Sequence, residues 1–274
     1  MQVTKPLGNA EYLYHYTSLE AFVSIIESGA LWATHIRYLN DTSEQRLAWG
    51  LIRERMRSLR GMSDETRNEN IEFYCKTLES PPHEDFFIAS FSCDGGDRLS
   101  QWRGYKADIA IGFDPVQLDT VCANFWEGHR EVRIRKVNYV ESSATPRSNE
   151  LIDNQRSGHM VTILGEEGFD VAYTRMWSRF ATMMKHQGFK EEEEWRVIIY
   201  DDAGRLEPSF SVRNGRMVPY IPLPLGGKLD SVVRRLTIGP GPFKDETLAA
   251  VRKLLASHHL QIEACATETP YRGW

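Results

Sequence analysis

An acidic run leads directly into an apolar segment near residue 194. Of all segments in the chain, this one has the residue types and spacing that best suit catalysis or ligand binding. Residues 191–194 are all glutamate, and Trp195 and Arg196 follow them. Because side chains alternate between the two faces of a strand, we expect Glu192, Glu194 and Arg196 on one face. Two carboxylates so placed could bracket one ligand, one stabilising positive charge and the other orienting a nucleophile. The alternative is a solvated charge run at a strand start, the commoner role of acidic runs.

A second chemically capable group lies between Ser100 and Tyr105, which we expect to be a loop after a strand that ends at Ser92. Trp102, Arg103 and Tyr105 fall within four positions of one another. Aromatic rings and a guanidinium suit a flat or phosphorylated ligand. The alternative is an aromatic plug that closes the end of the sheet, with Arg103 paired to a nearby carboxylate.

A third group ends a predicted strand near the N-terminus. Alternation places His15 on one face and Tyr14 and Tyr16 on the other. A histidine at a strand end can donate to a ligand hydroxyl, and a neighbouring aromatic offers a stacking surface. The alternative is a core histidine whose hydrogen bonds are satisfied, with Thr17 acting only as a helix cap. The residues alone favour this second interpretation.

Periodicity predicts the elements that would position these groups. A strand at Tyr12–Tyr16 precedes a helix at Leu19–Ser28, for which Thr17 and Glu20 have capping-box spacing and Gly29 is a suitable stop. Apolar and alternating runs predict further strands at Leu31–Thr34, Phe86–Ser92, Ile109–Phe113, Arg130–Val140, Glu194–Tyr200, Val232–Ile238 and Ile262–Ala266. A hairpin is expected to join Ser209–Val212 to Val218–Ile221 across Asn214-Gly215.

The order of these elements predicts an α+β fold, with a mixed, mostly antiparallel sheet and helices packed against it. There is no regular alternation of strand and helix, which argues against a doubly wound sheet. Helices are expected over Glu65–Leu78, Gly165–Lys185 and Asp245–Ser257, and after the turn at residues 40–43. We expect residues 1–274 to form a single domain with a helical insertion around residues 41–80.

Basic residues alternate along the predicted strand segment Arg130–Lys136. Such a strand could follow a phosphate backbone. More often it is an edge strand protected by charge, and we favour the edge.

The amino-acid composition excludes several classes of function. The 274-residue chain carries a formal net charge of −5, so the whole molecule is not a basic nucleic-acid binder. Its four cysteines are Cys75, Cys93, Cys122 and Cys265, whose wide spacing predicts reduced thiols rather than disulfides or a structural zinc site. We expect no bound metal, no membrane partner and a cytoplasmic location. Phosphate-cradling glycine motifs are also absent from the sequence.

Taken together, five short motifs resemble a widespread bacterial family known as domain of unknown function 2971. They are His15-Tyr16-Thr17, Ser90-Phe91-Ser92, Ser100 to Tyr105, Phe189 to Arg196, and Pro270-Tyr271-Arg272. This combination is specific and extends over nearly the whole chain, which implies one domain. The family name implies no activity.

The same chain more distantly resembles the ADP-ribosyltransferase superfamily. His15-x-Thr17, the following helix, Gly29 and the strand from Leu31 correspond to the opening strand, helix and second strand of those proteins. The resemblance implies that NAD is the substrate and that Glu194 at a strand start is catalytic, with Glu192 completing a Glu-x-Glu pair.

The ligand-binding residues are also implied by this resemblance. His15 would contact a ribose hydroxyl beside Tyr16, Thr17 and Ser92. Tyr105 or Trp102 would stack on nicotinamide, and Arg103 or Arg196 would hold the pyrophosphate.

The function so implied is NAD-dependent ADP-ribosylation of an intracellular protein or nucleic-acid target, as in a toxin or an antiphage effector. Two alternatives remain open from the residues. One is a noncatalytic module that senses a nucleotide or a partner. The other is a metal-dependent nuclease that uses Glu192, Glu194 and an aspartate.

Overall fold

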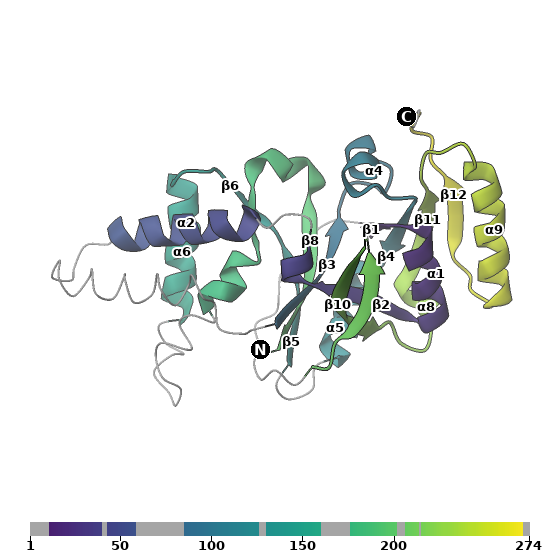
Figure 1. The fold of residues 1–274 in the computed structure, drawn as a ribbon, viewed down its shortest axis with the longest axis horizontal. Helices are drawn as coiled ribbons and strands as arrows, with labels where there is room; N and C mark the ends of the chain where they lie inside the picture. Colours follow the sequence, from purple (N-terminus) through teal and green to yellow (C-terminus); the bar gives the residue numbers. More distant parts are fainter. Residues whose placement is uncertain are drawn as a thin grey trace.

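A large, mostly antiparallel sheet with helices packed around it forms the body of the protein (Figure 1). The computed structural model describes residues 11–39, 43–58, 85–125, 130–159, 176–201, 206–213 and 215–270. The described part of the sheet has ten strands, and the main path runs β12-β11-β4-β1-β3-β2-β10-β9. Strand β8 joins this path by pairing with β3, and β5 pairs with β8. The predicted α+β class with a mostly antiparallel sheet is confirmed.

The strands of this sheet are β1 (Leu13–Thr17), β2 (Ala30–His35), β3 (Asp85–Ser92), β4 (Ile109–Phe113), β5 (Arg130–Lys136), β8 (Glu194–Asp201), β9 (Ser209–Arg213), β10 (Arg216–Pro224), β11 (Val233–Ile238) and β12 (Glu263–Ala266). A smaller sheet pairs β6 (Asn138–Val140) with β7 (Met184–His186). The helices are α1 (Leu19–Ser28), α2 (Ser43–Ser58), α4 (Leu99–Tyr105), α5 (Pro115–Asn124), α6 (Pro146–His159), α8 (Leu229–Val232) and α9 (Lys244–Ser257). Short 3-10 helices are η1 (Ile36–Tyr38) and η2 (Gln187–Glu192).

Helix α1 forms where its apolar stripe predicts it, with one change at its start. Its N-cap is Ser18, whose side chain accepts a hydrogen bond from the Ala21 amide at 3.3 Å, so the predicted cap at Thr17 is wrong by one residue. At its other end Gly29 has φ +62°, the left-handed conformation that glycine adopts at low cost. The helix buries Phe22, Ile25 and Ile26 against the sheet.

Strand β3 is the hub of the sheet because it has different partners along its two edges. Strand β8 pairs with it along its full length, from Asp85 to Ser92. Along the opposite edge, β1 pairs only near Ser92 and β2 only near Phe87 and Ile88. Strands β1 and β2 therefore separate along this edge, and His15 fills part of the gap through a 2.9 Å hydrogen bond between its Nδ1 and the Ser90 carbonyl.

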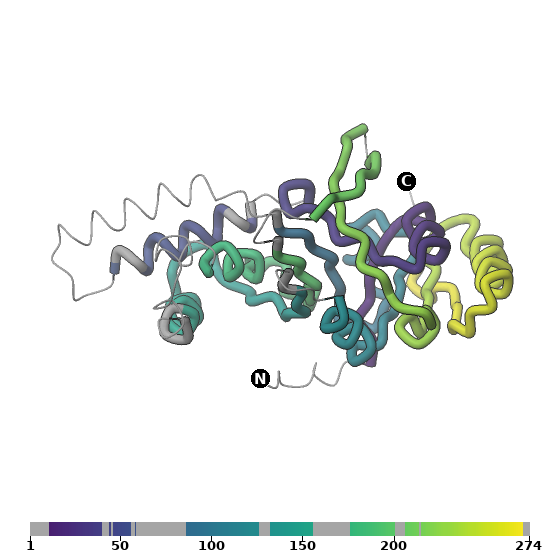
Figure 2. Tube along the Cα trace, turned by 90° about the horizontal axis from the view of Figure 1, so that it is seen from below, coloured from purple at the N-terminus to yellow at the C-terminus, as the bar shows by residue number. Residues whose placement is uncertain are grey.

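The interior has two main apolar clusters. One lies on a face of the large sheet beneath α1, α5 and α9 and includes Leu13, Phe91 and Phe113. The other surrounds Trp177 and is built from α2, α6, β6, β7 and the helical residues 176–181. We call these elements the helical unit; it extends to one side of the sheet in Figures 1 and 2.

Several predicted elements differ from the structure. Residues 99–105 form helix α4 rather than a loop. The predicted helix Gly165–Lys185 ends earlier, because Met184–His186 is strand β7; its first eleven residues lie outside the described part. Arg130–Val140 is divided between β5 and β6, which belong to different sheets.

Other predictions are confirmed. Strands β1, β3, β4 and β8 share one sheet, and β9 and β10 form the expected hairpin. Strand β5 pairs with β8 alone among the described strands, so the basic segment is an edge strand. The described cysteines Cys93, Cys122 and Cys265 are free thiols. The predicted helix Glu65–Leu78, Cys75, Tyr271 and Arg272 lie outside the described residues.

A glycine turn connects β3 to α4 beneath the ring of Tyr14. Gly95 and Gly96 have φ values of +87° and +80°, which L side chains rarely adopt. A Cβ on Gly96 would overlap the Tyr14 ring, whereas one on Gly95 would have no neighbour within 4 Å. The turn also carries Asp94, whose carboxylate accepts a hydrogen bond from the Tyr16 hydroxyl at 3.0 Å.

This contrast gives a matched test of the turn. Gly95→Ala should cost about 1–2 kcal/mol of unfolding free energy, because only the backbone is strained. Gly96→Ala should cost a further ~1–3 kcal/mol, because the new methyl group overlaps Tyr14. Urea unfolding of the two variants measures the difference. Equal losses would show that the Tyr14 contact does not constrain the turn.

Candidate functional site

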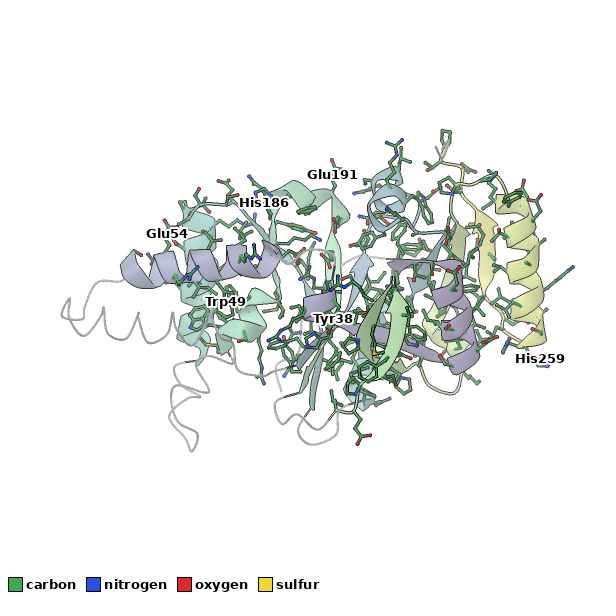
Figure 3. The ribbon with its side chains drawn as sticks, in the orientation of Figure 1. Tyr38, Trp49, Glu54, His186, Glu191 and His259 are labelled. Atoms are coloured by element: carbon green, nitrogen blue, oxygen red, sulfur yellow. The ribbon has the colours of Figure 1, made fainter. Side chains whose placement is uncertain are left out.

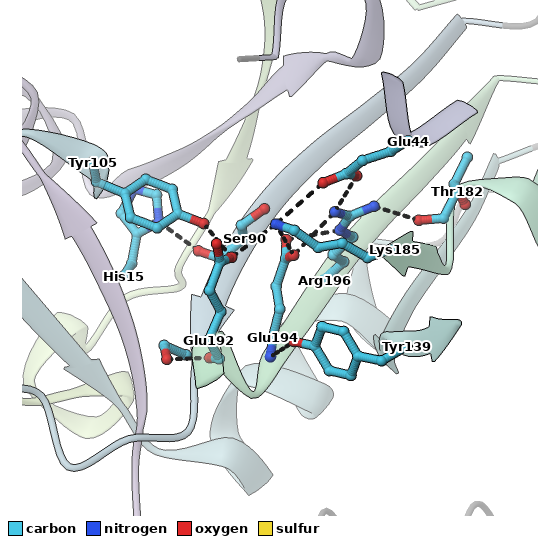
Figure 4. Close-up of polar contacts among 11 residues, drawn as sticks. His15, Glu44, Ser90, Tyr105, Tyr139, Thr182, Lys185, Glu192, Glu194 and Arg196 are labelled. Atoms are coloured by element: carbon cyan, nitrogen blue, oxygen red, sulfur yellow. Dashed lines mark hydrogen bonds and ion pairs between the residues drawn. The ribbon is translucent and has the colours of Figure 1, made fainter. Parts of the chain in front are cut away.

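Five charged side chains converge where the large sheet meets the helical unit (Figure 4). They are Glu44 from α2, Lys185 from β7, Glu192 from η2, and Glu194 and Arg196 from β8. We call this group the charge cluster. Three carboxylates face two cations, so the cluster carries one net negative charge when all five groups are ionised.

Arg196 is the most enclosed cation of the charge cluster, at 3% exposure. Its Nε donates to Glu194 Oε1 at 2.7 Å, and its Nη2 donates to Glu194 Oε2 at 3.0 Å. The same Nη2 also donates to Glu44 Oε2 at 2.6 Å, and Nη1 donates to the Thr182 carbonyl at 2.7 Å. The planar guanidinium thus joins β8 to α2 and to the end of the 176–181 helix.

Lys185 links all three carboxylates. Its Nζ lies 2.8 Å from Glu192 Oε2, 3.0 Å from Glu194 Oε2 and 3.1 Å from Glu44 Oε1. Burial acts to lower the pKa of Lys185, but the carboxylates, Glu194 first, outweigh it and raise the pKa above its usual value. The ammonium group therefore stays charged.

Glu194 is held as a buried anion. Burial acts to raise its pKa, but Arg196 and Lys185, together with a hydrogen bond from Ser90, hold the pKa at about 2. The side chain is 2% exposed, and both of its oxygens are occupied by the two cations. Its backbone is also fixed, because its amide donates to the Tyr139 hydroxyl at 2.7 Å.

Glu192 differs from Glu194 in exposure and in the direction of its pKa shift. Its side chain is 20% exposed, and its pKa is raised, first by burial and then by the nearby Glu194, against the opposing effect of Lys185. Within the described part of the chain, Lys185 and Tyr105 both contact Oε2. The other oxygen, Oε1, is therefore the one that a ligand could reach.

The local backbone explains how Glu192 reaches the cluster. The strand geometry predicted for Glu192 is wrong: it ends η2, and Glu193 adopts φ +43° before β8 begins at Glu194. The Ser92 hydroxyl donates to the Glu192 carbonyl and holds this end of η2 against β3. Glu194 and Arg196 do share a face as predicted. The neighbouring Glu191 is exposed at the surface in Figure 3, so the solvated alternative holds for only part of the acidic run.

Helix α4 brings Tyr105 to the exposed side of the cluster. Its hydroxyl donates to Glu192 Oε2 at 3.2 Å, and its ring stacks on Tyr16 with centroids 6.4 Å apart. Burial, followed by Glu194 and Glu192, raises the Tyr105 pKa, so the phenol stays protonated. Trp102 instead lies buried against Tyr16, and its Nε1 donates to Asp97 at 2.9 Å. Of the two aromatic candidates, Tyr105 is the one beside the carboxylates.

His15 lies outside the charge cluster but is connected to it. His15 packs on Phe91, on the face opposite Tyr14 and Tyr16 as predicted, and burial lowers its pKa so that the neutral imidazole is favoured. One residue, Ser90, connects it to the cluster: the Ser90 carbonyl bonds His15 and the Ser90 side chain bonds Glu194.

Three further candidates are placed as follows. Thr17 is partly buried, and its carbonyl accepts from the Asp108 amide at 3.0 Å. Arg103 is exposed on α4, whereas Arg196 is committed to the carboxylates. Of the two arginines considered for the pyrophosphate, Arg103 is therefore the one at the surface.

Four residues of the site are not predicted from the sequence. They are Glu44, Lys185, Tyr139 and Thr182. Glu44 lies 152 positions from the arginine that it contacts, and Lys185 falls in a segment predicted to be helical. Neither has a local pattern that distinguishes it from an ordinary surface charge. Only the approach of α2 and β7 to β8 brings them into the cluster.

Comparison with known proteins gives one finding about the family. Residues 101–197 match the model of a family described as "Protein of unknown function (DUF2971)". This segment runs from α4 to β8, and it contains four of the five charge-cluster residues; Glu44 lies before it. No curated protein and no solved structure matches the chain. Over the described residues, no helix has the length and apolarity to cross a membrane, and no group of three or more metal-ligating side chains is placed to hold a metal ion.

The low pKa of Glu194 predicts a pH-dependent contribution to stability. Its pKa falls from an ordinary 4.5 to about 2 on folding, so the stabilisation is complete above pH 4.5 and is lost as the pH falls towards 2. Glu194→Gln should therefore lower the unfolding free energy by about 3 kcal/mol at neutral pH. The difference in unfolding free energy between wild type and Glu194→Gln should decrease as the pH falls from 4.5 to 2.

Denaturant unfolding across this pH range measures the effect, and Glu191→Gln is the matched exposed control. The unfolding free energy of Glu191→Gln should equal that of wild type at every pH. A Glu194→Gln deficit that stays constant down to pH 2 would contradict the assigned ion pairs.

Proposed function

We propose that the protein transfers ADP-ribose from NAD to a protein or nucleic-acid acceptor, and that Glu192 is the carboxylate that meets the reacting sugar. The observation that carries the proposal is the contrast within the Glu-x-Glu pair. Glu194 has both oxygens bound by cations, whereas Glu192 is partly exposed and, among the residues that the structure describes, is contacted by other side chains only through Oε2. The distant resemblance of the motifs to ADP-ribosyltransferases supplies the reaction class.

In this reaction the bond between C1′ of the nicotinamide ribose and the pyridinium nitrogen breaks. The electron pair leaves with nicotinamide, and an oxocarbenium-like sugar develops. A nucleophile of the acceptor then bonds to C1′ and loses its proton. Catalysis requires negative charge beside the sugar at the moment when positive charge appears there.

The charge cluster suits this requirement. The buried ion pairs of Lys185 and Arg196 with Glu44 and Glu194 hold the cluster in place, so little reorganisation is needed during the reaction. When it is ionised, Glu192 supplies the net negative charge. Glu192 Oε1 would accept from a hydroxyl of the nicotinamide ribose. Lys185 and Tyr105 would hold Oε2 and orient the carboxylate. Glu194 acts through Lys185 and is a positioning residue in this scheme.

The flanking residues supply binding surfaces for the same ligand. Tyr105 is 36% exposed and offers one face of its ring beside Glu192. The neutral imidazole of His15 lies at the gap between β1 and β2. It is linked to the cluster by Ser90, which forms hydrogen bonds with both His15 and Glu194. Arg103, exposed on α4, would meet the pyrophosphate.

The proposal predicts a loss of rate without a matching loss of affinity. Glu192→Gln keeps the size of the side chain but removes its charge, so nicotinamide release should fall by about a hundred-fold or more. NAD affinity should change much less, because the ground-state sugar gives the carboxylate no full positive charge to stabilise. The two measurements are nicotinamide release over time, with cell extract supplied as acceptor, and calorimetric NAD binding.

Glu191→Gln is the matched control, because Glu191 is the exposed neighbour of Glu192. It should retain wild-type rate and affinity. Full turnover in Glu192→Gln would refute the catalytic assignment. NAD binding by wild type without nicotinamide release, even with extract present, would instead support a noncatalytic binding module.

A further inference from the structure

The hairpin of β9 and β10 presents large apolar side chains on one of its faces. Phe210 is 60% exposed, Val212 is 76% exposed and Met217 is 66% exposed. Met217 lies directly opposite Val212, and alternation puts Phe210 on the same face. We call these three side chains the hairpin patch. The hairpin itself, green in Figure 2, extends away from the rest of the chain. Apolar side chains gathered at an exposed surface are typical of an interaction site.

Strand β9 also has a free edge. It is the last strand of the main sheet path, and it pairs with β10 alone among the described strands. The unpaired backbone groups of an edge strand can pair with another chain, and charged side chains commonly prevent this. Edge strand β5 is protected in this way by Arg130, Arg133 and Arg135. Strand β9, with the sequence SFSVR, carries one charged residue, Arg213.

The charge of Arg213 is directed away from the free edge. Its Nη1 donates to Thr34 Oγ1 at 3.2 Å, and its Cζ lies 5.9 Å from the centroid of the Trp32 ring. Both of these residues belong to β2, and β10 lies between β2 and β9 in the sheet. The guanidinium therefore reaches across β10, and the free edge of β9 is left without a charged side chain to protect it.

The hairpin turn determines which backbone groups face the free edge. Arg213 and Arg216 lie opposite each other with two residues between them, and in such a turn the first residue accepts from the fourth. The backbone N–H and C=O of Arg213 and, by alternation, of Ser211 therefore face β10. The same groups of Phe210 and Val212 face outward, where no described strand pairs with them.

We propose that β9 pairs with β9 of a second copy of this chain, antiparallel about a two-fold axis at Ser211, and that the protein is thereby a dimer. In this register Phe210 of each copy exchanges both backbone hydrogen bonds with Val212 of the other. A register centred on Phe210 would instead bring Pro208, which has no N–H, into the pairing. One centred on Val212 would move the two copies of Arg213 closer together.

The side chains of the two copies also suit this register. Phe210 lies beside Val212 of the second copy on the same face, so the two hairpin patches join. Glu207 is exposed just before β9. It comes to lie beside the turn of the second copy, which carries Arg213 and Arg216, so opposite charges meet at both ends of the pairing.

The residue at the axis has an unused hydrogen-bonding group. Ser211 Oγ is buried and has no partner in the described part of the chain. Its counterpart in the second copy lies directly across the axis, on the same face of the sheet. After rotation about the Cα–Cβ bonds, one hydroxyl can donate to the other. Dimerisation thus provides a partner for a group that has none in the single chain.

The first test measures the oligomeric state. A single strand pair with a small apolar patch is a weak interface, so sedimentation velocity should show monomer at about 1 µM and dimer at about 200 µM. Phe210→Lys should raise the dissociation constant by on the order of tenfold or more, because it removes the ring and places a charge at the edge. Val116→Lys is the matched control, because Val116 is 67% exposed on α5, and it should dimerise like wild type.

Wild type that stays monomeric at about 200 µM would overturn the proposal. A dimer whose dissociation constant Phe210→Lys leaves unchanged would also overturn it. Phe210→Lys should keep the circular dichroism spectrum of wild type, because the ring that it replaces is exposed in the single chain.

The second test locates the axis by disulfide formation. Directly opposed residues that do not exchange backbone bonds have Cα atoms about 4.5 Å apart, within the range of a disulfide. Ser211→Cys should therefore give a covalent dimer on a non-reducing gel after oxidation. Val212→Cys is the matched control: the residue is more exposed, but its two copies would be diagonal neighbours about 7–8 Å apart and should link poorly.

Wild type, which keeps the native cysteines, gives the background of the second test. Cross-linking of Val212→Cys that equals or exceeds that of Ser211→Cys would indicate random collision or another register and would overturn the proposed axis. Neither test depends on the proposed transfer reaction.

Discussion

The structure depends on the burial of the Arg196 guanidinium between two carboxylates from distant parts of the chain. Removing a charge from water is costly, and a buried ion pair is tolerated only when its partners are well placed. Glu194 and Glu44 meet that condition with hydrogen bonds of 2.6–3.0 Å. Because Glu44 lies on α2, the same pair attaches the helical unit to the large sheet. Lys185 adds a second link through β7.

This arrangement shifts the pKa values of two nearby glutamates in opposite directions. Glu194 is enclosed by cations and has a pKa of about 2, so it serves as a fixed anion. Glu192 lies outside the guanidinium contacts, and its pKa is raised. Pairs of titratable groups whose environments separate their pKa values are typical of sites with divided roles. Glu194, in the interior of the cluster, therefore holds the neighbouring side chains in place. Glu192, at the exposed edge, is the carboxylate available to a ligand.

Local patterns in the sequence are sufficient to predict the main sheet. Alternation locates β1, β3, β4 and β8, and it places His15 and Tyr16 on opposite faces. It fails at α4, where serine and glycine in a short aromatic segment favour a loop; burial of Trp102 against Tyr16 stabilises a helix instead. It also fails at Glu192, because a left-handed residue before β8 interrupts the strand.

The candidate site is predictable only in part, for a physical reason. Glu192, Glu194, Arg196 and Tyr105 fall in segments whose composition is unusual, and the structure brings them together. Lys185 and Glu44 complete the cluster through contacts between elements remote in sequence, and no local period encodes such contacts. The sequence does not distinguish which of two aromatic residues lies beside the carboxylates, whereas the helical geometry of α4 does.

The most direct test of this account is the crystal structure of the protein with an NAD analogue whose ribose ring oxygen is replaced by a methylene group, which prevents cleavage. The account predicts Glu192 Oε1 within hydrogen-bonding distance of a hydroxyl of the nicotinamide ribose. It also predicts that Glu194 remains bound to Arg196 and Lys185. An analogue bound away from Glu192, or a Glu194 that leaves both cations to contact the sugar, would contradict it.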